Sequence, residues 1–170
     1  MAMNQAVPVG DDTAAIPDGH GGYLLFAIEG MVEDFIERMP WFAGFSAVMV
    51  NISDIYAMGG TPLFALALVG MPIKVLSNIT IAKILEGGSE ACRSAGIPIA
   101  GGHTIDSVEP IYGLVAIGIV DPKHVKSNAS AQAGDVLILG KPLGVGILSA
   151  ALKKDMLSPD GYREMISNTI

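Results

Sequence analysis

The stretch NISDIYAMGG, Asn51 to Gly60, decides which fold and which chemistry this sequence supports. It contains Asp54, the only charged residue between Arg38 and Lys74. Apolar residues before and within it recur at three- and four-residue spacing, which predicts a helix with one buried face that ends at the glycine pair. Asn51 and Asp54 share a face of that helix. Because a lone carboxylate is costly to bury, Asp54 must be exposed, capped or held by a cation.

Outward from this helix, strand-like and helix-like segments alternate along the chain. Periodicity and turn residues predict strands at 23–30, 62–73, 97–100, 111–120 and within 133–140, and helices at 41–58, at 77–96 and after 143. The helix at 77–96 has Ser77 as its expected N-cap and Gly96 just past its end. The apolar runs LFALALVG and IYGLVAIGIV suit strands that are covered on both faces. The alternation predicts a layered α/β or α+β domain.

The last residues differ in character from the rest of the chain. After Asp155 the sequence LSPDGYREMISNTI is polar and broken by turn residues. We therefore expect one domain over residues 1–154, and the start of a linker or of a truncated second domain over residues 155–170.

The charge balance bears on the kind of partner. The chain has 17 acidic and 10 basic residues, a net charge of −7, and no stretch in which Lys or Arg cluster. This composition predicts that nucleic acid is not a partner. If a polyanion such as ATP binds, divalent cations must mediate the contact, because carboxylates repel phosphate.

The high hydrophobic content, 51% of residues, raises the question of a membrane span. The long uncharged run between Asp54 and Lys74 is interrupted by GGTP at 59–62 and closed by Pro72, so it cannot form one continuous apolar helix. We expect no membrane association. The opening residues MAMNQAVPVGDD lack the pattern of a secretory signal, which predicts a cytoplasmic protein.

A single cysteine, Cys92, excludes an internal disulfide and a multi-cysteine metal site. Its neighbours SEACRSAG are typical of a helix interior. The sequence therefore predicts a buried structural thiol rather than a nucleophile.

Four polar islands interrupt the apolar background, and each falls at the end of a predicted strand or helix. They are Asp11 with Asp12, Glu29, Asn51 with Asp54, and the segment GGHTIDSVEP at 101–110. Mg²⁺ takes oxygen ligands, usually one or two carboxylates completed by water and substrate phosphate. Separated acids at element ends can supply such a shell.

Each island also has a simpler interpretation. GDD is common in turns for local backbone reasons, and Asn51 could merely satisfy a neighbouring backbone group. GGHT could be a tight turn with His103 on the surface. The same glycines also allow the backbone to approach a phosphate closely. The segment GKPLGVG lacks the phosphate-loop pattern, and no dinucleotide fingerprint follows the first strand.

The combination of motifs is more specific than any one of them. The segments at 10–16 (GDDTAAI), 51–72, 86–120 and 131–148 together closely resemble the N-terminal domain of the selenophosphate synthetase family. That family belongs to the superfamily of aminoimidazole ribonucleotide synthetase and thiamine-phosphate kinase. The resemblance implies an α+β fold, in which a layered mixed sheet has helices on one side and completes a barrel in a homodimer.

The resemblance also implies the ligands. Asp12 and Asp54 match magnesium-binding aspartates, and Asp54 also lies against the nucleotide phosphates. Contacts to ATP are implied for Val9, Gly10, Asp11, Glu29, Gly102, His103 and Thr104. Glu29 stands where the family has an aspartate. On this interpretation Mg²⁺ and phosphate complete the surroundings of Asp54 and explain its presence in an apolar helix.

In that family ATP phosphorylates selenide and releases AMP and phosphate, so selenide is the implied phosphate acceptor. The family's glycine-rich segment with its catalytic cysteine and lysine has no match here, Cys92 is not that cysteine, and the C-terminal domain is missing. We therefore expect an inactive fragment of a longer enzyme. Two alternatives stay open: a relative that uses ATP on a different substrate, and a non-catalytic nucleotide-binding dimerisation module.

Overall fold

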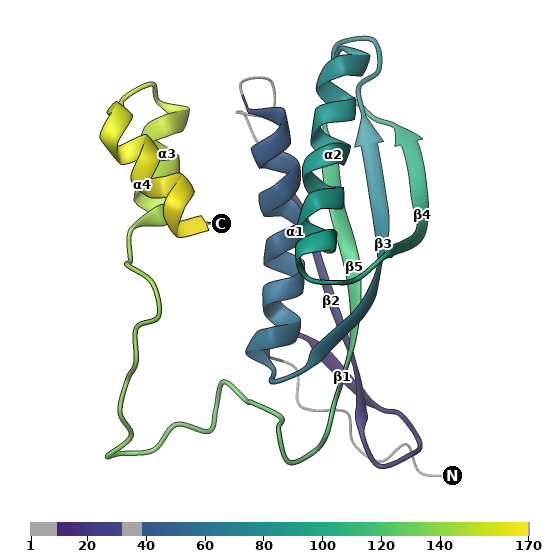
Figure 1. Cartoon of the computed structure of the whole chain (residues 1–170), viewed down its shortest axis with the longest axis vertical. Coiled ribbons are helices and arrows are strands. Elements are labelled where there is room, and N and C mark those ends of the chain that lie inside the picture. Colours follow the sequence, from purple (N-terminus) through teal and green to yellow (C-terminus); the bar gives the residue numbers. More distant parts are fainter. Residues whose placement is uncertain (1–9, 32–38, 170) are drawn as a thin grey trace. The chain divides into compact units, whose positions relative to one another are not determined.

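The computed structural model describes residues 10–31 and 39–169, which divide after Ser130 into two compact units. The first unit contains a five-stranded sheet with two helices, and the second contains two short helices (Figure 1). The expected domain boundary after residue 154 lies inside the second unit and stays a prediction.

The sheet of the first unit has the strand order β1-β2-β5-β3-β4. Its strands are β1 (Ala14–Pro17), β2 (Tyr23–Met31), β3 (Thr61–Met71), β4 (Ile99–Asp106) and β5 (Ile111–Val120). β3 and β4 pair in parallel and the other neighbours are antiparallel. The predicted α+β class with a mixed sheet is therefore confirmed.

Helices α1 (Pro40–Ala57) and α2 (Asn78–Ser94) pack side by side, and both lie on the same side of the sheet (Figure 1). α1 contacts β2, β5 and β3, and α2 packs mainly against α1. The apolar stripe predicted for α1 is buried, with Val48, Ile52 and Ile55 fully enclosed. Burial of each such side chain stabilises the fold by roughly 2 kcal/mol. The expected arrangement of helices on one side is confirmed.

Two glycines allow α1 and α2 to approach until their backbones touch. A Cβ placed on Gly44 of α1 would overlap the carbonyl oxygen of Ile84, and one on Gly87 of α2 would overlap the carbonyl oxygen of Trp41. Because both obstacles are backbone atoms, a side chain at either glycine forces the helices apart.

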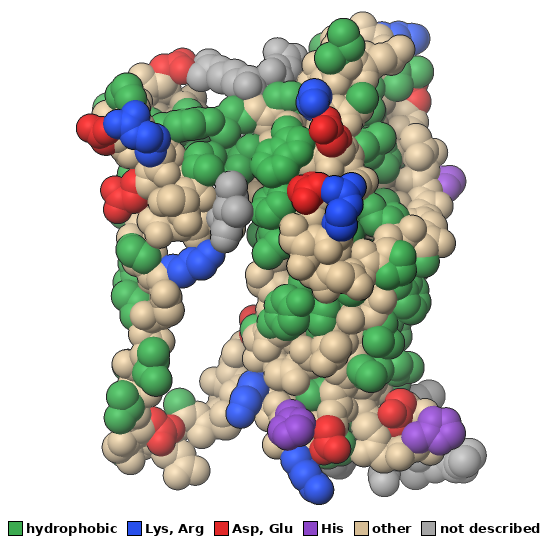
Figure 2. Space-filling view, viewed as in Figure 1, with side chains coloured by type: hydrophobic (Ala, Val, Ile, Leu, Met, Phe, Trp, Pro, Cys, Tyr) green, Lys and Arg blue, Asp and Glu red, His purple; other side chains and the backbone are tan. Residues whose placement is uncertain are grey.

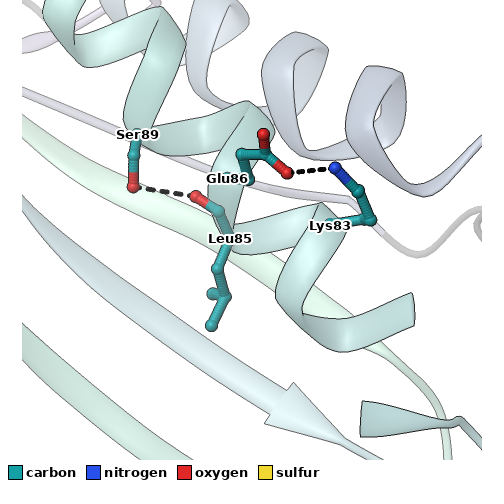
Figure 3. A network of polar contacts seen from close by, with 4 residues as sticks. All are labelled: Lys83, Leu85, Glu86 and Ser89. Carbon is teal, nitrogen blue, oxygen red and sulfur yellow. Dashed lines mark hydrogen bonds and ion pairs between the residues drawn. The ribbon is translucent and has the colours of Figure 1, made fainter. Parts of the chain in front are cut away.

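The predicted ends of both helices are confirmed by hydrogen bonds and backbone conformation. The Ser77 hydroxyl accepts from the Thr80 amide at the start of α2, and Gly96 follows its end with a φ of +72°. α1 ends before Gly59, whose φ is +75°. On the exposed side of α2, Lys83 pairs with Glu86 at 2.5 Å and Ser89 donates to the carbonyl of Leu85 at 2.8 Å (Figure 3).

The face of the sheet that points away from α1 and α2 is apolar and partly exposed. β5 is buried over most of its length, as predicted, but β3 alternates between buried and exposed residues. Leu63, Leu66 and Leu68 of β3 are each about 40% exposed. The prediction that both apolar runs are covered on both faces is wrong for β3, because the helices cover one face only.

The segment GGHT at 101–104 is not a tight turn. It continues β4, because each residue from Gly101 to Thr104 pairs with a residue of β3. Gly102 takes a φ of +156°, and a Cβ there would overlap the carbonyl oxygen of Ala67. The glycine is required because β3 approaches the backbone at this point.

The second unit differs from prediction in two places. The expected strand within 133–140 does not form: the segment has no strand partner among the described residues, and Val136 to Leu139 are exposed. The polar tail forms a helix, α4 (Pro159–Thr169), which packs against α3 (Val145–Lys153). Proline at the first helical position and an acid in the first turn favour that helix.

Candidate functional site

The site is built where α1 passes over β2. Asn51 on α1 is fully buried, and its Oδ1 accepts a hydrogen bond from the Glu29 amide at 2.8 Å. Its Nδ2 donates to the carbonyl oxygens of Glu29 at 3.2 Å and Ala47 at 2.8 Å. Of the two interpretations of Asn51, the structure supports the backbone-satisfying one. Asn51 thereby places Glu29 beside the last turns of α1.

Asp54 is partly buried in the last turn of α1, one helical turn beyond Asn51. Burial, and next the charges of Glu29 and Asp12, raise the pKa of the Asp54 carboxyl to about 6. The carbonyl end of a helix also disfavours negative charge. Two acids from other segments, Glu29 and Asp12, therefore act electrostatically on Asp54, and all three acids were singled out from the sequence.

The donors at this place suit a divalent cation but do not complete a metal site. Carboxylate oxygens are the ligands that Mg²⁺ prefers, and the unneutralised charge favours a cation. Within residues 10–31 and 39–169, no three His, Cys, Asp or Glu side chains have an arrangement that could hold a metal ion. A cation bound by Asp12 and Asp54 must therefore take further oxygens from water or a ligand.

Asp11 has partners that the sequence did not reveal. Its carboxylate accepts a hydrogen bond from the Asn128 amide at 2.7 Å and one from the Ser127 hydroxyl at 3.3 Å. These residues follow β5 and lie more than a hundred positions after Asp11 in the sequence. Val9, expected to contact ATP, lies outside the described residues.

Thr13, next to Asp12, is a second feature that sequence reasoning missed. Its side chain is buried, and its hydroxyl has no hydrogen-bond partner among the described residues. Buried hydroxyls are seldom left unpaired in folded proteins. No sequence signal distinguishes this threonine from one at a surface turn.

Gly102, His103 and Thr104 lie on β4, at the far edge of the sheet from β2. Glu29, Leu114, Ala67 and Gly102 form one row across four strands. With strands spaced about 4.8 Å apart, Glu29 and Gly102 are separated by roughly 14 Å along that row. The structure therefore brings Glu29 together with Asp54 and Asp12, and keeps the β4 residues apart from them.

The two groups also differ in the face they occupy. Side chains two residues apart on a strand point to the same face, so Glu29 shares the face of Leu25 and Ala27, which are buried under the helices. His103 pairs with Leu68, whose side chain lies on the opposite face. An open cavity of about 480 Å³ includes residues of both groups in its lining: Glu29, Gly102 and His103. The rest of the lining is mainly apolar.

The cysteine, the basic residues and the helices were the subject of predictions that do not concern this site. Cys92 is buried as predicted, and burial raises the pKa of its thiol to about 11. Lys and Arg side chains are scattered over the face seen in Figure 2 and do not form one basic patch there. No helix in the described part of the chain has the length and hydropathy to cross a bilayer.

Comparison with known proteins shows similarity along most of the chain. It is 69% identical over 130 residues to the selenide, water dikinase of Pseudomonas straminea, a match that covers 76% of this chain and 36% of that protein. It is 60% identical over 166 residues to the selenide, water dikinase of Paraburkholderia xenovorans, covering 95% of this chain and 46% of that protein. The chain thus spans less than half the length of these relatives.

Solved structures share the fold at low sequence identity. The crystal structure of tt0281 from Thermus thermophilus matches with a TM-score of 0.81 at 21% identity, over 98% of this chain and 55% of that one. AaThiL complexed with AMPPCP and TMP matches with a TM-score of 0.76 at 23% identity, over 95% of this chain and 53% of that one. Both support the fold assignment alone.

The model of the family described as AIR synthase related protein, N-terminal domain, matches residues 10–120. That range holds the whole five-stranded sheet, α1 and α2. Because it covers more than half of this sequence, the chain belongs to the AIR synthase related family and contains its N-terminal domain.

Proposed function

We propose that this chain is the ATP- and Mg²⁺-binding part of a selenide, water dikinase. The observation that carries the proposal is the convergence of Asp12, Glu29 and Asp54 from three segments, in a chain that is 69% identical to such an enzyme over 130 residues. Uncompensated carboxylates that repel one another destabilise a fold, most of all where one of them is partly buried, as Asp54 is. A bound cation and a phosphate chain give them a function.

Asp12 and Asp54 are the proposed ligands of Mg²⁺. Mg²⁺ held by these carboxylates would neutralise the triphosphate and orient it for attack. The proposed contacts to ATP are Val9, Gly10, Asp11, Glu29, Asp54, Gly102, His103 and Thr104. The cavity that Glu29, Gly102 and His103 help to line supports a ligand beside these three residues.

The carboxyl group of Asp11 already accepts hydrogen bonds from Ser127 and Asn128. Its proposed role toward ATP therefore includes holding this segment in place beside the nucleotide. Positioning and electrostatic stabilisation are the main contributions a protein makes to phosphoryl transfer.

We propose a homodimer in which the apolar outer face of the sheet is covered by a second copy. The supporting observation is the exposure of large apolar residues from several strands of the sheet, including Ile28, Leu66, Leu68 and Ile105. Contiguous apolar surface of this kind is typical of an interface. Pairing two such sheets would complete a barrel.

The full reaction proposed for the longer protein uses ATP to phosphorylate selenide, a small-molecule acceptor. We place the protein in the cytoplasm as part of the same proposal, because the reaction draws on the cellular ATP pool. The chain by itself, less than half the length of its relatives, is proposed to bind Mg²⁺-ATP without turnover.

The test is thermal unfolding of the 170-residue chain with Mg²⁺-ATP, with ATP plus EDTA, and with Mg²⁺ alone. Selective binding to the folded state raises the unfolding midpoint. We expect a rise that needs both metal and nucleotide, and that is lost in Asp54→Asn. A midpoint that is unchanged by Mg²⁺-ATP contradicts the proposed site in this chain.

A further inference from the structure

We propose that Asn51 is a positioning residue, which stands in for a missing strand at the open edge of β2 and thereby fixes Glu29 relative to Asp54. The inference rests on the proposed function, because it concerns the same site. It is carried by three hydrogen bonds of one fully buried side chain.

The edge of β2 is open at Glu29 because β1 is too short to cover it. β1 pairs only with residues 23–26 of β2, whereas β5 pairs with β2 from Tyr23 to Met31. Beyond Phe26, β2 therefore has β5 as its one strand neighbour, and no strand among the described residues lies along its other edge. Unpaired backbone groups at such an edge are costly when they are shielded from water.

The Asn51 carboxamide matches the groups that this edge presents. In a strand, the N–H and C=O of one residue point to the same side, and a strand neighbour bonds to both. Asn51 does the same, accepting from the Glu29 N–H at 2.8 Å and donating to its C=O at 3.2 Å. One side chain from α1 thus replaces one residue of a neighbouring strand.

A third hydrogen bond fixes the orientation of the amide. The second N–H of Asn51 donates to the carbonyl of Ala47, one turn earlier on α1, at 2.8 Å. Both amide protons are then used, and the oxygen has its donor. Aspartate has the same shape, but its carboxylate would face two carbonyl oxygens without a proton to donate. Only asparagine among residues of this size satisfies all three groups.

This arrangement opposes a specific force. Glu29 and Asp54 repel each other, and Asp54 is on the same helix face as Asn51. Without these three hydrogen bonds, here called the clamp, pairing with β5 alone would hold the end of β2 against this repulsion. With the clamp, the Glu29 backbone is tied to the helix that carries Asp54. The backbone of Glu29 is therefore held beside the Asp54 helix before any ligand binds, which lowers the cost of ordering the site.

The test compares Asn51→Leu with Val48→Ala in the 170-residue chain. Leucine keeps the size of the side chain and removes all three hydrogen bonds. Val48 is equally buried on α1, so its truncation lowers stability by loss of packing. At a temperature where both variants are fully folded, we expect Asn51→Leu to weaken Mg²⁺-ATP binding at least tenfold and Val48→Ala to leave it within twofold. Equal affinities in the two variants would overturn the proposal.

Amide hydrogen exchange provides a readout that needs no ligand. We expect the Glu29 amide to be protected at least tenfold more than that of an unpaired edge residue, and protection to be lost in Asn51→Leu while the Leu25 amide keeps it. A Glu29 amide that exchanges freely in the parent refutes the clamp, even if Asn51→Leu fails to fold. Failure of the parent to bind Mg²⁺-ATP, with Glu29 protected, refutes the proposed function and leaves the clamp standing.

Discussion

Asp54 in the last turn of α1 and Glu29 on β2 repel each other across the junction of helix and sheet. Together with burial and the charge of Asp12, this repulsion raises the pKa of Asp54 to about 6. In the free protein the carboxylate therefore destabilises the fold at neutral pH. The relationship predicts opposite effects on stability and on ligand binding when the charge is removed.

Replacing Asp54 with asparagine tests this opposition. Without metal, Asp54→Asn should leave the unfolding midpoint unchanged or raise it, because a repelled charge is removed. Binding of Mg²⁺-ATP should weaken by one or two orders of magnitude, because a proposed ligand is lost. Calorimetric titration and thermal unfolding in EDTA measure the two effects. Glu109→Gln, which removes an exposed charge elsewhere, is the control and should change neither. Tight binding by Asp54→Asn shows that the assigned role is wrong.

The raised pKa also predicts how stability depends on pH. The ordinary value for Asp54 is 3.8 and its folded value is about 6, so between these the folded state holds a proton that the unfolded chain releases. The contribution of Asp54 to the free energy of unfolding should therefore fall as pH rises from about 4 to about 6, and then level off.

Urea unfolding in EDTA across this pH range measures the dependence for the parent and for Asp54→Asn. The difference between the two should be small near pH 4 and should grow toward neutral pH in favour of the variant. Parallel curves for the two proteins would show that Asp54 titrates at its ordinary value.

The contact of α1 with α2 predicts strong destabilisation by a single methyl group. Gly87→Ala places a Cβ on the backbone carbonyl of Trp41, and backbone cannot move without separating the helices. We expect a loss of about 2 kcal/mol in the free energy of unfolding, despite alanine's better helix propensity. In Gly101→Ala the new Cβ meets only Leu66 at 3.7 Å, an ordinary contact, so this control should stay near the parent value. Chemical denaturation measures both, and similar values for the two variants would contradict the tight crossing.

The exposed face of the sheet predicts a charge-sensitive dimer. Leu68→Glu introduces a carboxylate in the middle of the proposed interface, where it could not be solvated. Light scattering after size exclusion should show a dimer for the parent and a monomer for this variant. Val75→Glu, at an exposed apolar residue on the loop after β3, should remain dimeric. A monomeric parent at all concentrations tested rules out the proposed dimer for this chain.

Local patterns were sufficient to predict α1, α2 and the acids, although not α4. The three- and four-residue spacing around Asp54 identified α1, the glycines gave its end, and Ser77 gave the start of α2. These features depend on neighbours within about one helical turn, so the sequence contains the information directly. The unusual position of a carboxylate in an apolar helix was likewise visible without coordinates.

Strands and long-range partners required the tertiary structure. GGHT is part of β4 because β3 pairs with it, and the segment at 136–139 is not a strand because no described residue pairs with it. The hydrogen bonds of a strand come from residues distant in sequence, so β propensity alone does not decide whether they form.

The difference between local and long-range interactions also decides which features of the site could be predicted from the sequence. The sequence by itself determined which oxygen donors are available, Asp12, Glu29 and Asp54, and that they lie at the ends of elements. Only the tertiary structure decided that Asp12 and Glu29 act on Asp54, that Asn51 bonds to the Glu29 backbone, and that Asp11 holds Asn128. Residue identity fixes the chemistry of a donor, whereas distance and burial, which set its charge and its partners, arise from packing between distant segments.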